Sequence, residues 1–413
     1  MMVRILTVLL FVSIQLQAQN KSIVRLLNSD NLSGTVINGE SVRNFVGNVQ
    51  IENEGSLLFA DRMAKYEVRN FWDATGNVKL IDKGVTLTSE FAKYFPDEKR
   101  SQFRSKVHLI SDSNDLFSDF GTYNMESRIA EFWGNTKLID AEKNIIYSDS
   151  ITHYENENHS ILKSKVKIIN QSDRTVITGG YAEYFGDRKF SFVNRMPFLY
   201  QYPEKGSSDT LFVIGKYMES YQGDIQRYSV FGNVRVLNGL MSAKADTLVM
   251  LRNQNLMKLR NNPIVWFEST QISGDSIDIY TENNELRVIN CYGSSIAVSA
   301  LDSMPNKYNQ LKGKTISYKF RNKVIYQIDV HLTAESIYYL DEEGEPAGAN
   351  VSSGDEMTIY FVNGLVDRIK IVGGIEGKFL PESVVRRDPV FLRGFYWADN
   401  IRPLLGEMRN YVR

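Results

Sequence analysis

The sequence predicts an all-β protein built from antiparallel strand repeats of about 29 residues, because its composition, its periodicity and its internal repetition agree. Tyr and Phe are abundant, with 22 of each, and Pro is scarce at 9, a balance that favours strands over helices. Within a repeat, apolar and polar residues alternate: Val78 and Leu80 share one face, while Asn77 and Lys79 share the other. Each repeat is therefore expected to form two half-buried strands of about ten residues, each bent near its middle.

Two motifs recur in phase, and they give the repeat its length. The first, Gly-Asn-Val-x-Leu or a close variant, begins at Gly47, Gly76, Ser105, Gly134 and Ser164, in steps of 29, 29, 29 and 30 residues. The second has Ser-Asp or Ser-Glu near its middle and closes on Tyr66, Tyr94, Tyr123, Tyr154 and Tyr184. Gly-Asn and Ser-Asp tolerate turns and bulges, so they mark the two bends, and the carboxylates are expected to satisfy the bent backbone. The tyrosines are expected to pack as cross-strand ladders.

The N-terminus has the form of a secretory signal peptide over residues 1–18. Arg4 precedes an apolar stretch from Ile5 to Ile14, and Leu16-Gln17-Ala18 looks like a cleavage site. The stretch is too short to cross a bilayer as a helix. The mature protein is therefore expected to be exported.

The repeats divide the remaining chain into three expected parts. Residues 19–200 form an N-terminal repeat domain, and residues 201–380 form a C-terminal one that is either separate or continuous with the first. Between them, two prolines and a Gly-Ser-Ser run predict a long loop over residues 196–208. Residues 381–413 form a tail that docks on the end of the sheet, forms a short helix near Leu404-Leu405, or stays mobile.

Composition and motif searches exclude several classes of function. The 48 basic residues nearly balance the 49 acidic ones, so no nucleic-acid partner is expected. The single cysteine, Cys291, is expected to be buried, and the four histidines are expected at solvated positions without metal-ligand spacing. Acidic residues such as Asp246 and Asp275 recur in the repeat, which suits architecture better than the single carboxylate cluster of a polysaccharide-active enzyme. The sequence thus predicts no catalytic residue, no metal and no cofactor.

The paired motifs resemble the OstA-like family, clearly over residues 25–195 and more weakly over residues 205–375. The resemblance implies an elongated, twisted β-jellyroll, open along one side like a taco, that shelters the acyl chains of lipopolysaccharide in the periplasm. It also implies an inner-membrane lipopolysaccharide export complex and an outer-membrane lipopolysaccharide translocon as partners, and end-to-end self-association. This chain departs from the family in being about twice the length expected for a bridge protein and in its poorly matching tail.

Candidate groove residues are the apolar positions expected to alternate inward. They are Val49, Ile51, Leu58, Val78, Leu80, Leu87, Val107, Leu109, Leu138, Val166, Ile168, Val234 and Val236. If the space between the sheets stays open, these residues bind lipid; if large side chains fill it, they are ordinary core. The sequence therefore leaves two functions: a periplasmic lipopolysaccharide carrier, or a non-catalytic structural scaffold of the cell envelope with a filled core.

Overall fold

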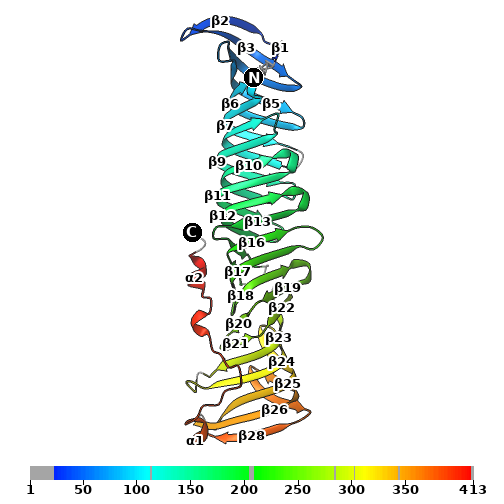
Figure 1. Cartoon of the computed structure of the whole chain (residues 1–413), viewed down its shortest axis with the longest axis vertical. Helices are drawn as coiled ribbons and strands as arrows, with labels where there is room; N and C mark the ends of the chain where they lie inside the picture. Colours follow the sequence, from blue (N-terminus) through cyan, green and yellow to red (C-terminus); the bar gives the residue numbers. More distant parts are fainter. Residues whose placement is uncertain are drawn as a thin grey trace, which may run out of the picture. The chain divides into compact units, whose positions relative to one another are not determined.

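The computed structural model describes residues 23–111, 114–203, 209–282, 285–301, 303–342 and 345–410 (Figure 1). The predicted signal peptide, residues 1–18, lies outside them. The chain forms two compact units: Met1–Asp112 with Phe120–Arg128, and Ser113–Asp119 with Ile129–Arg413. Both consist almost entirely of antiparallel strands, which confirms the predicted all-β class.

The first unit contains seven complete strands and part of an eighth among its described residues. They are β1 (Arg25–Asn28), β2 (Asn31–Ile37), β3 (Glu40–Asn53), β4 (Ser56–Tyr66), β5 (Phe71–Asp82), β6 (Val85–Phe95), β7 (Arg100–Ile110) and part of β8 (Asn114–Asn124), with the short 3-10 helix η1 (Pro96–Glu98) between β6 and β7. From β3 to β7, each strand pairs antiparallel with the next.

The second unit continues the antiparallel series from β9 to β28. Its strands are β9 (Ile129–Asp140), β10 (Ile145–Tyr154), β11 (His159–Asn170), β12 (Thr175–Phe185), β13 (Phe190–Asn194), β14 (Phe198–Gln201), β15 (Leu211–Ile214), β16 (Tyr217–Tyr221), β17 (Arg227–Asn238), β18 (Met241–Leu251), β19 (Leu256–Arg260), β20 (Ile264–Phe267), β21 (Thr270–Ser273), β22 (Ser276–Glu282), β23 (Glu285–Ala300), β24 (Tyr308–Arg321), β25 (Val324–Glu342), β26 (Glu345–Val362), β27 (Leu365–Val372) and β28 (Glu376–Pro381). Its short helices are η2 (Glu155–Glu157), η3 (Gly186–Arg188), η4 (Arg252–Gln254), α1 (Glu382–Val385), η5 (Asp399–Ile401) and α2 (Leu405–Arg409). Strand β14 lies inside the range expected to be a loop and pairs with both β12 and β15, so the ladder is unbroken there.

The bends occur where the motifs predict them. Gly76 and Asn77 have φ values of +78° and +44°, and the pairing of β5 with its neighbours shifts register there. Asn77 donates a hydrogen bond of 3.0 Å from Nδ2 to Oδ2 of Asp61, which lies at the bend of the adjacent strand β4. Asn135 and Asp119 make the same contact at 2.7 Å. The second-motif carboxylates therefore do hold the bends, as predicted.

Because every long strand bends, the two halves of each strand belong to two different ladders. In the first unit we call one ladder sheet A (residues 49–53, 56–60, 78–82, 85–89 and 108–110) and the other sheet B (residues 40–46, 62–66, 71–75, 91–95 and 100–104). Strands of the second unit split in the same way; in β17, for example, residues 227–231 join sheet B and residues 234–238 join sheet A. We call the space between the inward faces of A and B the seam.

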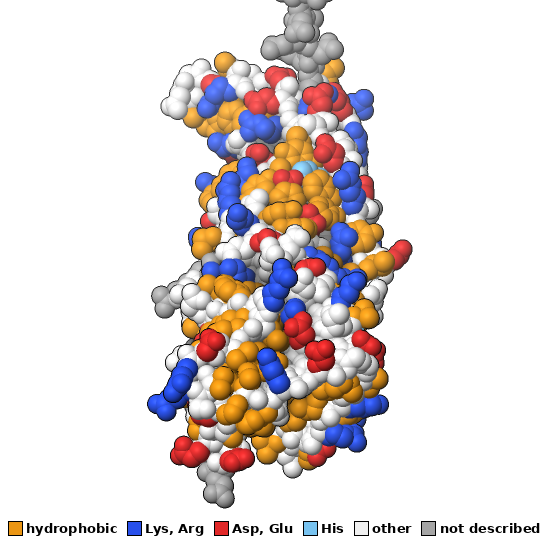
Figure 2. Space-filling model, turned by 60° about the horizontal axis from the view of Figure 1, so that its bottom comes forward, with side chains coloured by type: hydrophobic (Ala, Val, Ile, Leu, Met, Phe, Trp, Pro, Cys, Tyr) orange, Lys and Arg blue, Asp and Glu red, His pale blue; other side chains and the backbone are white. Residues whose placement is uncertain are grey.

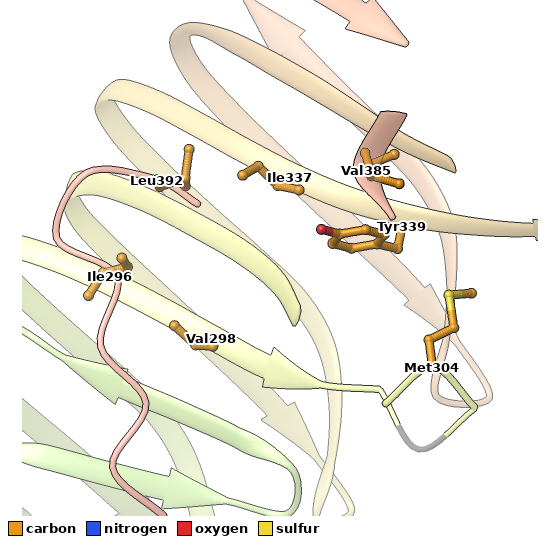
Figure 3. Packing of buried hydrophobic residues seen from close by; sticks show 8 residues of the cluster. Ile296, Val298, Met304, Ile337, Tyr339, Val385 and Leu392 are labelled. Atoms are coloured by element: carbon orange, nitrogen blue, oxygen red, sulfur yellow. The ribbon is translucent and has the colours of Figure 1, made fainter. Parts of the chain in front are cut away.

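In the second unit, the tail after β28 forms a third layer on the outer face of sheet A. Leu392 N donates to Oε1 of Gln310 at 2.8 Å, and Ala398 N donates to Oε1 of Gln271 at 2.8 Å. Both glutamines return a bond from Nε2 to a tail carbonyl, at 3.2 Å and 2.7 Å. Figure 3 shows Val385 and Leu392 packed over the strands that carry Ile337 and its neighbours. The tail therefore lies along the outer face of sheet A rather than on the end of the sheet, and it includes the expected short helix as α2.

Hydrophobic side chains also reach the surface in places. Figure 2 shows them in patches on one face, separated by Lys, Arg, Asp and Glu side chains. In the second unit, Phe117, Trp133 and Tyr147 are 37%, 42% and 38% exposed. The residues turned into the seam are, by contrast, nearly all buried.

Candidate functional site

In the first unit, five of the predicted groove residues form a single row across sheet A. Register partners place Ile51, Leu58, Leu80, Leu87 and Leu109 side by side on β3 to β7, and each is at most 3% exposed. Val49, Val78 and Val107 lie two residues closer to the bend on the same face, and each is 1% exposed. The alternation seen in the sequence thus produces a continuous apolar stripe.

Sheet B supplies the opposite wall of the seam in the first unit. Its inward row joins Phe45, Met63, Ala74, Ala92 and Phe103 through register partners. All five are at most 3% exposed. The described part of the seam is therefore packed with side chains.

The second unit repeats this arrangement over a longer series of strands. Its sheet A row runs through Leu138, Ile146, Ile168, Ile177, Leu199, Val213, Val236, Ala243, Val265, Ile272, Ala297 and Leu311. Val166 and Val234, the remaining predicted residues, are buried on the same face near the bends. Ile168 alone among the thirteen is half-buried, beside a pocket of about 50 Å³. Whether any of these residues binds lipid stays a prediction.

A larger apolar pocket of about 130 Å³ lies between the sheets at β21 to β27. Small side chains line it on sheet A, among them Ala297, Ser299 and Ser336. Tyr318 and Ile328 face them from sheet B. Sequence reasoning missed this pocket because Ala and Ser do not stand out in an apolar alternation, although they are what leaves the space.

Part of the chain matches a known protein family. Residues 21–172 match the family model of OstA-like protein. This segment belongs to the OstA-like family. Over these residues, the match confirms the resemblance drawn from the repeated motifs.

The structure is similar to that of LptH, the LptA homologous periplasmic component of the lipopolysaccharide transport device from Pseudomonas aeruginosa. The identity is 17%, the match covers 34% of this chain and 95% of that chain, and the TM-score is 0.27. No curated protein matches the sequence.

The tyrosines of the OstA-like segment have two different roles. Tyr66 stacks on Phe71 across the strands of sheet B, with ring centroids 4.4 Å apart, as a cross-strand ladder requires. Tyr94 and Tyr123 instead point into the seam, where they are 4% and 1% exposed. Burial raises the pKa of Tyr94 to about 12. Tyr94 accepts a hydrogen bond from Nδ2 of Asn53, and Tyr123 donates one to Asp82, and both of these partners lie on sheet A. The prediction that the tyrosines pack as cross-strand ladders is therefore wrong for Tyr94 and Tyr123.

The histidines also differ from expectation. His153, on β10 of the same segment, is 9% exposed rather than solvated, and its Nδ1 lies 3.0 Å from Oγ of Ser160. Desolvation lowers its pKa to about 4. His159 is sandwiched between Tyr154 and Phe185, whereas His331 is exposed.

The single cysteine lies in the second unit. Cys291 is fully buried, as predicted, and its burial raises the pKa of the thiol to about 12. Over the described ranges, no group of three His, Cys, Asp or Glu side chains could hold a metal ion. No helix in the described part of the chain has the length and apolarity needed to span a membrane.

Proposed function

We propose that this protein is a periplasmic carrier that binds lipopolysaccharide and passes its lipid A acyl chains along the seam toward the outer membrane. The observation that supports this most is the inward row of apolar residues on sheet A within each unit, in a chain whose residues 21–172 are OstA-like. Each buried methylene contributes about 0.8 kcal/mol, so acyl chains gain from an apolar lining.

The carriage would be passive. Successive copies offer a similar apolar environment, so a chain moves from one copy to the next with little change in free energy. Phosphates and sugars would remain in water at the edge of the sheets. Lipid would be loaded by an inner-membrane export complex and received by an outer-membrane translocon.

The test is site-specific photocrosslinking in protein purified from its own envelope. A photoreactive residue replaces Leu80 in the first unit or Ile168 in the second, because both face the seam. Matched controls carry it at the outward neighbours Lys79 and Lys167. Lipopolysaccharide attached at the inward positions and absent from the controls supports carriage. Protein that stays unlabelled at both inward positions, when a known carrier is labelled in parallel, refutes it.

The burial of both rows favours a second candidate, a structural scaffold. A seam whose lining residues are at most a few per cent exposed is also what a filled rod requires. The same experiment separates the two functions, because a scaffold with a permanently filled core leaves both inward positions unlabelled.

A further inference from the structure

The mouth of the seam, where the hairpin ends of sheets A and B meet, is joined by side chains of the two sheets. In the first unit, Tyr123 lies near the end of β8, which sits beside the sheet B turn at Lys99, and its Oη donates a hydrogen bond of 2.9 Å to Oδ2 of Asp82 on sheet A. One copy earlier, Nδ2 of Asn53 donates to Oη of Tyr94. Both pairs span 41 residues of sequence, so the contact recurs with the repeat.

The second unit closes its mouth with equivalent contacts. Tyr228 on β17 donates a 2.9 Å hydrogen bond to Oδ2 of Asp173, in the turn before β12. Further along, the rings of Phe267 on sheet A and Phe320 on sheet B meet edge to face, with centroids 4.9 Å apart. Tyr228, Phe267 and Phe320 are the last inward-facing residues of their rows and are at most 5% exposed, so they close the apolar seam from water.

Ion pairs and polar hydrogen bonds between the turns also join sheets A and B at the mouth, on the solvent side of the contacts described above. Lys99 Nζ lies 2.9 Å from Glu54 in the first unit. In the second unit, Lys189 lies 3.1 Å from Glu142, and Nη1 of Arg252 donates to Oε1 of Gln201 at 3.0 Å. Each joins a turn of sheet B to a turn or strand end of sheet A.

The hydrogen bonds at the mouth can break at low cost when sheets A and B move apart. Asp82 is 2% exposed, and it accepts hydrogen bonds from Ser56 at 2.7 Å and from Tyr123. When the sheets separate, Asp82 keeps its bond to Ser56 within sheet A and water can replace Tyr123, so the carboxylate and the phenol lose little on exposure. The apolar rows behind them would lose contact with each other, unless an apolar ligand takes the place of the opposite wall.

We propose that these mouth contacts are clasps, which hold the seam shut in the free protein and open one copy at a time as an acyl chain enters from the side. This inference rests on the proposed function and adds its regulation. It explains how a seam that is filled in the free protein can still accept lipid: the clasp residues, rather than the core residues, determine where the sheets part.

The decisive experiment locks one clasp. In a Cys291→Ala background, Asp82→Cys and Tyr123→Cys are joined by dibromobimane, a short thiol crosslinker that becomes fluorescent when both ends react. The control pair, Lys79→Cys with Thr88→Cys, joins register partners on the outward face of sheet A and leaves the mouth unlinked. Both proteins carry the photoreactive residue at Leu80 and are incubated with purified lipopolysaccharide.

We expect labelling at Leu80 to be lost when the mouth is crosslinked and retained with the control crosslink. Equal labelling of the two crosslinked proteins would overturn the clasps, while leaving lipopolysaccharide binding intact. No labelling of any protein, including those without crosslinker, would overturn the proposed function and the clasps with it.

A variant that releases the clasp tests the opposite direction. Tyr123→Phe keeps the ring but removes the hydroxyl that bonds Asp82, so lipopolysaccharide should label Leu80 faster than in the parent. Tyr66→Phe is the matched control, because the Tyr66 ring stacks within sheet B. A labelling rate for Tyr123→Phe equal to that of the parent and of Tyr66→Phe would contradict the clasp.

Discussion

At the scale of single residues, the buried imidazole of His153 links stability to pH. Its pKa is about 4 in the fold, against 6.5 for the free side chain. Between these values the unfolded chain binds the extra proton, so stability falls as pH drops from about 6.5 toward 4.

Denaturant unfolding measured across this range should show a loss on the order of 3 kcal/mol that is absent from His153→Gln. The comparison isolates this residue, because all carboxylates remain in both proteins. If the two pH profiles run parallel, His153 is protonated in the fold without cost and the argument is wrong.

Leu87 tests how tightly the seam is packed. It is fully buried in the sheet A row of the first unit. Leu87→Ala should lower the free energy of unfolding by about 2–5 kcal/mol, because a cavity remains where the side chain was. Its neighbour Thr88, half-buried on the outward face, is the control, and Thr88→Ala should change stability by no more than about 0.5 kcal/mol. A loss below about 1 kcal/mol for Leu87→Ala would indicate a seam that collapses or is already loose.

Sequence reasoning succeeded for residues whose position follows from strand alternation. Ile51, Leu58 and Leu80 fall in one row because residues two apart share a face and the repeat keeps the register. It failed for Tyr94 and Tyr123, because a hydrogen-bond partner 41 residues away on the other sheet leaves no mark on local periodicity.

At the scale of elements, the irregular second half has a physical cause. Runs such as Ile264–Phe267 and Leu211–Ile214 lack the alternation of the first unit, because the tail covers the outer face of sheet A while sheet B covers the inner one. A strand buried on both faces is apolar at consecutive positions. The pattern could have suggested a third layer, but it could not identify the tail as that layer.

The docking of the tail depends on two glutamines that look unremarkable in the sequence. Gln310→Ala removes the bonds to Val390 O and Leu392 N, so the tail should detach more often near these residues. Hydrogen exchange of the Leu392 amide should become faster, whereas the exposed Gln254→Ala should leave it unchanged. Unaltered exchange in Gln310→Ala would mean that the apolar contacts of Val385 and Leu392 hold the tail by themselves.

At the scale of the whole chain, most described pairings join strands that are near in sequence, which is the condition for a molecule that unfolds in parts. The tail breaks this rule in the second unit. Arg402 reaches Glu268 O at 2.7 Å across 134 residues, and Gln271 reaches Tyr396 O across 125. Unfolding should therefore be more cooperative in the part of the second unit that the tail contacts.

Two tryptophans report on these regions separately. Trp72 is 5% exposed in the first unit, and Trp266 is fully buried in the row of sheet A that carries Gln271 and Gln310. Variants that retain one of them, with the other tryptophans replaced by Phe, should unfold in denaturant with different midpoints, the Trp266 transition being the later and steeper. Removal of the tail should lower the Trp266 midpoint and leave that of Trp72 in place. Coincident curves for the two probes would instead show that stability is shared along the entire chain, and that the sequence-local pairings do not set its folding units.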